Sequence, residues 1–284
     1  MKRFYLVAFF LMTVSATLSA KSKVVTDSLY SEILGCYRAY NVCLPDSWSK
    51  DQGRTYPVLY LLHGLGGNND SWQKNGNIEE IMDYLVGGRT VEEMVVIMPN
   101  ADADSERAQH GYYNHADWRY EDFFFQELVP HVEGKYRIKA EKKNRAIAGL
   151  SMGGGGTVAY AQKHPEMFCA AYAMSAFVSS KGRTAGKEVK NKVELMTISQ
   201  SENDCVEFVK NASDEIKTQL RTVDWYVDCG DDDYLLLINL EFVAEMKKAG
   251  IPFEFRVREG GHKWEYWRTA LHICLPFVTR AFDR

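Results

Sequence analysis

The sequence predicts an α/β fold in which a mostly parallel central sheet is covered by helices on both faces. Short, nearly continuous apolar runs at residues 56–62, 94–100 and 145–150 are typical of strands that are buried on both faces. Segments with helical periodicity, such as residues 78–85 and 153–164, follow these runs. The chain has 284 residues, of which 46% are hydrophobic and 25% are charged. This length and composition suit a single large core.

The rest of the chain continues this alternation, with one aperiodic loop and one polar excursion. The loop at residues 101–118 is rich in aromatic side chains, and we expect it to form a wall of the site. The excursion at residues 177–220 has a cap-like character, with short helices expected at 205–210 and 213–220. Edge strands are expected at residues 31–45 after a polar leader, further strands at 169–174, 225–227 and 253–257, and further helices at 121–136, 236–248 and 264–282.

The first twenty residues are predicted to be a secretory signal peptide. Lys2 and Arg3 precede an apolar run at residues 4–14, and small residues follow as far as Ala20, where we expect cleavage. The apolar run is shorter than the ~20 residues that a membrane-spanning helix needs. We therefore expect an exported protein, periplasmic or secreted, with residues 21–284 as a single domain and no membrane contact in the mature form.

Charge and cysteine content argue against several classes of function. The formal charge of −4 becomes −6 once Lys2 and Arg3 are removed, because the 34 basic residues fall by two against 38 acidic ones. This balance does not favour nucleic acid as a partner. The six cysteines include no Cys-x-x-Cys pair, so the usual zinc and redox motifs are absent from the sequence. Four of them lie in apolar runs, where a buried thiol is common: Cys36, Cys43, Cys169 and Cys229.

Residues 149–153 read Gly-Leu-Ser-Met-Gly and match the G-x-S-x-G pattern of a nucleophile elbow. In such an elbow a strand turns sharply into a helix, and the serine hydroxyl is exposed at the turn. The two glycines are needed because the backbone approaches its neighbours too closely for a side chain. Ser151 is therefore the candidate nucleophile, with a predicted strand before it and a predicted helix after it.

A serine hydroxyl needs a base to accept its proton. His262 is the candidate base because it follows the last predicted strand in a glycine-flanked loop. Three other histidines lie on predicted helices, where a structural role is more usual: His131, His164 and His272.

The base in turn needs a carboxylate to orient it. Three adjacent acids follow the predicted strand at 225–227, and the residues alone do not separate Asp231, Asp232 and Asp233. An acidic triplet also suggests a calcium site, but it lacks the spaced ligands of an EF-hand loop. The order serine, acid, histidine is that of the α/β-hydrolase fold.

The tetrahedral intermediate of acyl transfer needs two hydrogen-bond donors for its oxyanion. The α/β-hydrolase fold supplies one from the residue after the nucleophile, here the backbone amide of Met152. The other is expected from the glycine-rich loop at residues 63–67, where we select the amide of Leu65. Phosphate binding is the competing interpretation of these glycines. However, neither the glycine cluster at residues 63–67 nor that at 149–156 fits G-x-G-x-x-G or ends in a P-loop lysine. No cofactor or metal is therefore expected.

These motifs together resemble the "putative esterase" family of α/β-hydrolases. The family includes feruloyl and acetylxylan esterases of carbohydrate esterase family one, tributyrin-type esterases, S-formylglutathione hydrolase and mycolyltransferases. The resemblance extends from about Ser31 to the C-terminus. It implies Asp233 as the acid, three residues after the glycine of the Asp-x-Gly motif, and it implies Leu65 and Met152 as the oxyanion donors. Formylglutathione hydrolases usually carry Thr-Cys where this chain has Gly66-Gly67, a departure that argues against that member.

The resemblance and the signal peptide together imply an exported serine carboxylesterase. Its substrate would be a small-molecule or oligosaccharide ester, with the acyl groups of plant polysaccharide as the first choice, as in feruloyl or acetylxylan esterases. The alternatives are a short-chain, tributyrin-type esterase, an acyltransferase, or a non-catalytic glycan-binding relative. Candidate substrate contacts are the aromatic residues Tyr112, Tyr113 and Trp267.

Overall fold

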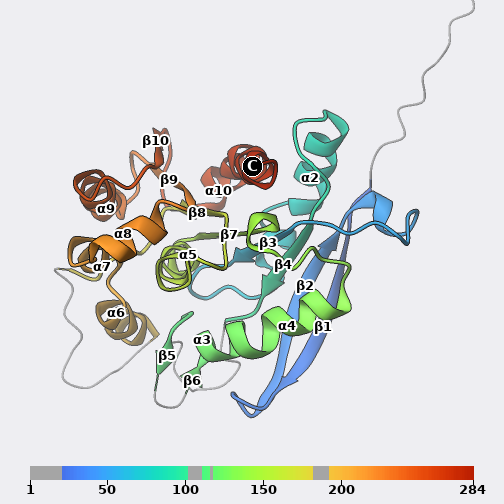
Figure 1. The fold of residues 1–284 in the computed structure, drawn as a ribbon, viewed down its shortest axis with the longest axis horizontal. Helices are drawn as coiled ribbons and strands as arrows, with labels where there is room; N and C mark the ends of the chain where they lie inside the picture. The colour runs from blue at the N-terminus through green and yellow to red at the C-terminus, as the bar shows by residue number, and fades with distance from the viewer. Residues whose placement is uncertain (1–20, 102–110, 116–117, 182–191) are drawn as a thin grey trace, which may run out of the picture.

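The computed structural model describes residues 21–101, 111–115, 118–181 and 192–284 (Figure 1). The predicted signal peptide lies outside these residues and stays a prediction. The centre of the molecule is an eight-stranded sheet in the order β1-β2-β4-β3-β7-β8-β9-β10. The strands from β4 to β10 in this order run parallel, whereas β1 and β2 are antiparallel to their neighbours. The predicted mostly parallel sheet is therefore confirmed.

The strands of this sheet are buried as their sequences predict. In β3, Val58, Tyr60 and Leu62 enter the core on one face, and Leu59 and Leu61 enter the core on the other. The strands are β1 (Lys23–Ser31), β2 (Cys36–Leu44), β3 (Val58–Leu62), β4 (Val95–Pro99), β7 (Arg145–Leu150), β8 (Ala170–Met174), β9 (Asp224–Gly230) and β10 (Glu254–Arg258); β5 (Asn114–His115) and β6 (Trp118–Arg119) form a separate pair.

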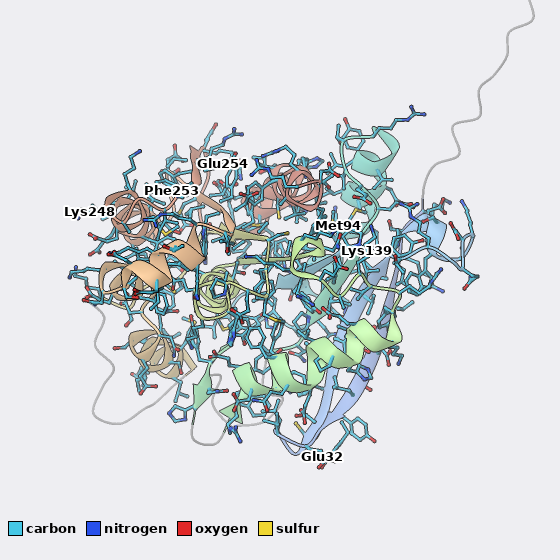
Figure 2. The ribbon with its side chains drawn as sticks, in the orientation of Figure 1. Glu32, Met94, Lys139, Lys248, Phe253 and Glu254 are labelled. Carbon is cyan, nitrogen blue, oxygen red and sulfur yellow. The ribbon has the colours of Figure 1, made fainter. Side chains whose placement is uncertain are left out.

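The N-terminal edge of the sheet departs from the prediction. Residues 23–30, which the sequence predicts as a polar leader, form strand β1 together with Ser31. The strand pairs along its whole length with β2, from Lys23 opposite Leu44 to Ser31 opposite Cys36. Glu32 lies at the turn between these two strands, at one end of the molecule (Figure 2). The strand lies at the edge of the sheet and exposes much of its surface. Its more buried positions alternate between apolar and polar residues, from Val25 to Ser31, so the hydrophobic pattern did not indicate a buried strand.

Helices cover both faces of the sheet, as predicted. Helices α2 and α10 lie on one side of the sheet and α4 and α5 on the other (Figure 1). The helices are α1 (Ser71–Lys74), α2 (Ile78–Gly87), α3 (Tyr120–Phe123), α4 (Val129–Lys135), α5 (Met152–Lys163), α6 (Lys192–Glu202), α7 (Cys205–Lys210), α8 (Asp214–Leu220), α9 (Leu236–Lys248) and α10 (Trp264–Phe282), with short turns at η1 (Asp46–Trp48), η2 (Phe124–Leu128) and η3 (Lys142–Asn144). Among the described residues, no helix combines the length and apolarity needed to cross a membrane.

The helix predicted at 121–136 is continuous from α3 to α4 but contains a π-helical turn, η2. Pro130 follows this turn in α4. Because proline has no backbone N–H and its ring clashes with the preceding turn, it disrupts the regular α-helical hydrogen bonds, which accounts for the wider turn.

The excursion at 177–220 contains the two predicted helices, α7 and α8, and a third, α6, that the sequence did not indicate. Its described residues pack onto the core beside α5, with Phe177, Val206, Val209 and Leu220 buried there. The described part of the excursion contributes no residue to the pocket at Ser151.

All six cysteines are free, and four are buried: Cys43, Cys205, Cys229 and Cys274. Burial raises the pKa of the Cys229 thiol to about 12. A thiol of this kind is protonated at neutral pH and therefore a weak nucleophile.

The first turn of α5 touches the end of β3 with no room for a side chain. A Cβ atom on Gly153 would lie 2.5 Å from the carbonyl oxygen of His63 and 2.6 Å from that of Leu62. These are backbone atoms of the last residue of β3 and of the buried residue that follows it, so they have little freedom to move.

Gly153→Ala should therefore lower the free energy of unfolding by at least about 2 kcal/mol through overpacking. The matched control is Gly134→Ala in α4, where no atom lies within 4 Å of the added Cβ. That substitution should raise stability by up to about 1 kcal/mol, because alanine favours the helix. Urea unfolding measures both, and equal stability of the two variants would contradict the close approach.

Candidate active site

Ser151 occupies the turn between β7 and α5 in a strained backbone conformation. Its φ is 54° and its ψ is −117°, values that residues other than glycine rarely adopt. Three backbone hydrogen bonds hold this conformation. The Ser151 N–H donates to the Met174 carbonyl at 2.9 Å, and the N–H groups of Gly155 and Phe177 donate to the Ser151 carbonyl at 3.0 and 2.9 Å. The turn thus has the geometry of a nucleophile elbow.

The Ser151 hydroxyl is linked to His262 and Asp233 by a chain of hydrogen bonds. Ser151 Oγ lies 2.9 Å from His262 Nε2. On the other side of the ring, His262 Nδ1 lies 2.9 and 3.1 Å from the two carboxylate oxygens of Asp233. A carboxylate accepts a hydrogen bond, so Nδ1 carries the proton in the neutral ring and Nε2 is free to accept the proton of the serine.

Asp233 is only 4% exposed, yet its surroundings favour the charged form. Burial alone would raise the pKa of this carboxyl. Hydrogen bonds from His262, from the Leu235 N–H at 2.8 Å and from the Ser175 hydroxyl outweigh burial and hold the pKa of Asp233 below its usual value. The group is therefore ionised at neutral pH.

The structure separates the three adjacent acids that the residues alone left equivalent. Asp233 contacts His262, whereas Asp231 and Asp232 are exposed. Asp231 instead accepts the Gly260 N–H at 2.9 Å, and the Asp232 N–H donates to the Gly260 carbonyl at 3.1 Å. These two residues therefore attach the loop of His262 to the turn that carries Asp233.

A second carboxylate, Asp228, supports the same loop from inside the protein. It is fully buried and accepts hydrogen bonds from Arg258 at 3.1 and 3.2 Å, from Tyr172 at 2.6 Å and from Tyr266. The Tyr266 ring packs where a side chain on Gly260 would lie. Sequence reasoning missed this cluster, although an acid within an apolar strand was a usable signal.

Ser175, which sequence reasoning also missed, links the backbone of Asp228 to Trp267 in the wall of the pocket. Its N–H donates to the Asp228 carbonyl at 2.7 Å, and its hydroxyl oxygen accepts the indole N–H of Trp267 at 3.1 Å. Its φ of 45° is another strained value. No local pattern marks this serine, because its partners come from distant parts of the chain.

The loop after β3 is held by a buried histidine. His63 Nε2 accepts the Ala101 N–H at 2.9 Å, so Nδ1 carries the proton and donates it to the Gly64 carbonyl at 2.8 Å. Burial lowers the pKa of His63 to about 4. This neutral ring therefore fixes the start of the loop that carries Leu65.

The two predicted oxyanion donors lie beside the serine. Leu65 lines the same pocket as Ser151. Met152 is the first residue of α5, so its amide has no acceptor within the helix, and its side chain is buried in the core. The backbone amide of Met152, and not its side chain, can therefore donate a hydrogen bond to a substrate.

A cavity of about 340 Å³ opens at Ser151 and His262. One wall comes from the loop after β3 and from α1, and the other from the turn after Asp233 and the start of α10. The lining residues are Gly64, Leu65, Gly66, Gly67, Ser71, Asn75, Leu150, Ser151, Tyr234, His262, Trp264 and Trp267. Among the described residues, no group of three or more His, Cys, Asp or Glu side chains is arranged to hold a metal ion.

The predicted aromatic contacts divide into two groups. Trp267 lines the cavity, and its ring packs edge-on against His262 at a centroid distance of 4.9 Å. Tyr112 and Tyr113 are buried, and their hydroxyls donate to the His63 carbonyl and to Gln200 at 3.0 and 2.8 Å.

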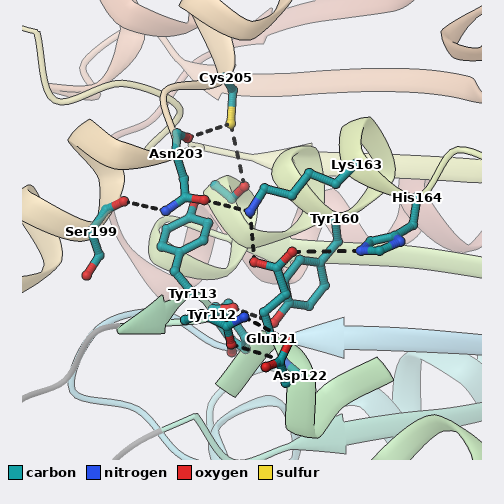
Figure 3. A network of polar contacts seen from close by, with 12 residues as sticks. Tyr112, Tyr113, Glu121, Asp122, Tyr160, Lys163, His164, Ser199, Asn203 and Cys205 are labelled. Carbon is teal, nitrogen blue, oxygen red and sulfur yellow. Dashed lines mark hydrogen bonds and ion pairs between the residues drawn. The ribbon is translucent and has the colours of Figure 1, made fainter. Parts of the chain in front are cut away.

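The prediction that Tyr112 and Tyr113 contact the substrate is therefore corrected. Figure 3 shows both rings in a polar network with Glu121 and Lys163. Tyr113 receives the Lys163 ammonium over its ring at 5.7 Å. Aromatic content in a loop does not distinguish a packed ring from an exposed one, and here both rings lie against α5.

The family of the chain follows from comparison with known proteins. Residues 31–278 match the model of the family described as "Putative esterase". The chain belongs to this esterase family. The predicted resemblance is therefore confirmed.

Curated proteins that are similar in sequence support the assignment of this chain to the esterase family. An endo-1,4-beta-xylanase/feruloyl esterase of Xylanibacter ruminicola is 30% identical over 249 residues, which is 86% of this chain and 30% of that protein. An acetyl esterase of Caldicellulosiruptor saccharolyticus is 25% identical over 80% of this chain and 84% of its own length. The chain spans less than a third of the length of four of the curated relatives that it matches.

Solved structures are similar in both sequence and fold. A ferulic acid esterase is 48% identical, with a TM-score of 0.89 over 92% of this chain and 99% of that chain. An S-formylglutathione hydrolase from Staphylococcus aureus is 22% identical, with a TM-score of 0.73 over 91% of this chain and 99% of that chain. At this lower identity the second match shows the α/β-hydrolase fold alone.

The buried neutral state of His63 predicts a pH-dependent stability. In the unfolded chain a histidine binds a proton below about pH 6.5, whereas in the folded protein His63 does so only near its lowered pKa of about 4. The unfolded state therefore binds more protons between these values, and stability falls as the pH drops through this range. Between pH 7 and pH 5 the contribution of His63 should amount to about 2 kcal/mol.

His63→Asn removes this titration and keeps an amide N–H that can reach the Gly64 carbonyl. Urea unfolding at pH 7 and pH 5 should show a smaller loss of stability in the variant than in the wild type. Parallel losses in the two proteins would show that His63 is not the group responsible.

Proposed function

We propose that this protein is a serine carboxylesterase that hydrolyses acyl esters of plant polysaccharide or oligosaccharide by an acyl-enzyme mechanism. The observation that carries the proposal is the hydrogen-bonded chain from Ser151 through His262 to Asp233 at the open cavity. Membership of the esterase family and the 48% identity to a ferulic acid esterase support the choice of reaction and substrate.

In the first half of the reaction, Ser151 Oγ attacks the carbonyl carbon of the ester while His262 Nε2 takes the hydroxyl proton. Asp233 holds the ring in the correct tautomer and stabilises the imidazolium. The amides of Leu65 and Met152 donate hydrogen bonds to the oxyanion that forms. The ester bond to the alcohol then breaks, and the leaving oxygen takes the proton from His262.

In the second half, a water molecule attacks the acyl-enzyme carbonyl and gives its proton to His262. The bond to Ser151 breaks, and the serine oxygen recovers that proton. The sum is an ester plus water converted to an acid plus an alcohol, with the enzyme unchanged. An acyltransferase would use the same residues with an acceptor alcohol in place of water.

The substrate proposal draws on the relatives that act on plant cell walls. A feruloyl group is flat and aromatic, and the cavity presents the aromatic rings of Trp264 and Trp267. An acetyl group would use little of this surface. We therefore propose feruloyl esters as the preferred substrates, with acetyl esters second.

Ser151→Ala should abolish turnover of methyl ferulate and of p-nitrophenyl acetate, because the attacking oxygen is removed. Release of ferulate or nitrophenol measures both rates, and a fluorophosphonate probe should label the wild type and not the variant. Equal rates in the two proteins would exclude Ser151 as the nucleophile. Failure of the wild type to react with either ester or with the probe would favour a non-catalytic relative.

Asp233→Asn should lower kcat by about 10⁴, because the histidine loses the carboxylate that sets its tautomer. The matched control is Asp231→Asn, two residues away, where an amide oxygen can still accept the Gly260 N–H. The control should lower kcat by less than about tenfold, since only one exposed hydrogen bond weakens. A larger loss in the control than in Asp233→Asn would move the role of the acid to Asp231.

A further inference from the structure

One aromatic side chain at the mouth of the cavity has no part in the proposed chemistry. Tyr234 follows Asp233 directly in the chain and lines the cavity, yet its side chain is 65% exposed. Its ring lies over that of His262, with a centroid distance of 4.6 Å and an angle of 48° between the ring planes. An aromatic ring is therefore open to solvent directly beside the catalytic imidazole.

The backbone on both sides of Tyr234 is anchored. Asp233 is held by His262, and the buried Leu235 donates its N–H to the Asp233 carboxylate at 2.8 Å. The following residues begin helix α9. The Tyr234 ring is thus presented from a fixed point, which lowers the entropic cost of binding a ligand against it.

The chemistry of the site determines which part of an ester lies near this ring. His262 Nε2 must give its proton to the oxygen of the leaving alcohol, so that oxygen comes within hydrogen-bond distance of Nε2. The carbonyl oxygen lies on the side of the Leu65 and Met152 amides. Groups that flank the imidazole at the cavity mouth are therefore closest to the alcohol part of the ester.

Among the described residues, two aromatic rings contact His262, and they differ in their exposure to solvent. Trp267 is 6% exposed, and its indole N–H is already bonded to Ser175. The Tyr234 side chain, by contrast, is 65% exposed. The apolar C–H face of a sugar ring packs on an exposed aromatic ring of this kind.

We propose that Tyr234 is a specificity-determining residue that binds the sugar carrying the ester, on the leaving-group side of the site. The inference rests on the proposed esterase function and extends it to the alcohol. The ring selects esters of a saccharide over esters of a small alcohol, while the acyl group is bound elsewhere in the cavity.

The test compares two esters of the same acid, methyl ferulate and a feruloylated arabinoxylan oligosaccharide. Tyr234→Ala should lower kcat/KM for the oligosaccharide ester by about tenfold, mainly through KM, because stacking on the ring is lost. It should change kcat/KM for methyl ferulate by less than about twofold, since that alcohol is too small to reach the ring. Tyr234→Phe should retain most of the preference for the oligosaccharide.

The matched control is Leu237→Ala. Leu237 is 78% exposed on α9, three residues further along, and lies outside the set of described residues that line the cavity. This substitution should leave both esters unaffected.

Three outcomes would overturn the inference while the wild type is active. Equal losses of kcat/KM on both esters in Tyr234→Ala would mean that Tyr234 positions His262. A loss confined to methyl ferulate would place the acyl group at the ring. No loss on either ester would show that the ring does not contact the substrate. A wild type that hydrolyses neither ester would overturn the proposed function, and this inference with it.

Discussion

The site depends on the close approach of the Ser151 turn to the end of strand β3. Gly153 lies against the carbonyl oxygens of Leu62 and His63, and this contact places the first turn of α5 on the sheet. The position of the turn forces Ser151 into a strained conformation, and hydrogen bonds with Met174 and other backbone groups sustain it. A rigid, buried sheet thus supports a strained residue at the carboxyl end of strand β7.

The other two members of the hydrogen-bonded chain are held as one unit. The turn carrying Asp233 and the loop carrying His262 approach so closely that a side chain on Gly230 would overlap the Gly260 backbone. Asp231 bonds to the same loop from the solvent side. Asp228 bonds to it from inside through Arg258 and Tyr266. Because both loops are tied together, the distance between the acid and the base has little freedom to vary, which is the preorganisation that acid–base chemistry requires.

The sequence predicted the strands and helices that are rich in apolar residues and failed where that signal was weak. β1 was missed because its more buried positions, from Val25 to Ser31, alternate between apolar and polar residues. Helix α6 was missed because its apolar positions have no marked helical period, although Met196 is buried. Tyr112 and Tyr113 were misplaced because burial of an aromatic ring depends on what packs against it, here α5 and its neighbours.

By itself the sequence determined the features that are local in the chain. The elbow at Ser151 is such a feature, because a strand, a turn and a helix follow each other within a few residues. The glycine-flanked position of His262 is another. The residues alone left three adjacent acids equivalent, and only the family resemblance pointed to Asp233. The tertiary structure places Asp233 against that histidine, with Ser175 bonded to the acid and Tyr234 beside the imidazole. These contacts depend on where separate parallel strands end, because their carboxyl ends lie side by side in the sheet. Residues far apart in the sequence come close together there only when the chain folds.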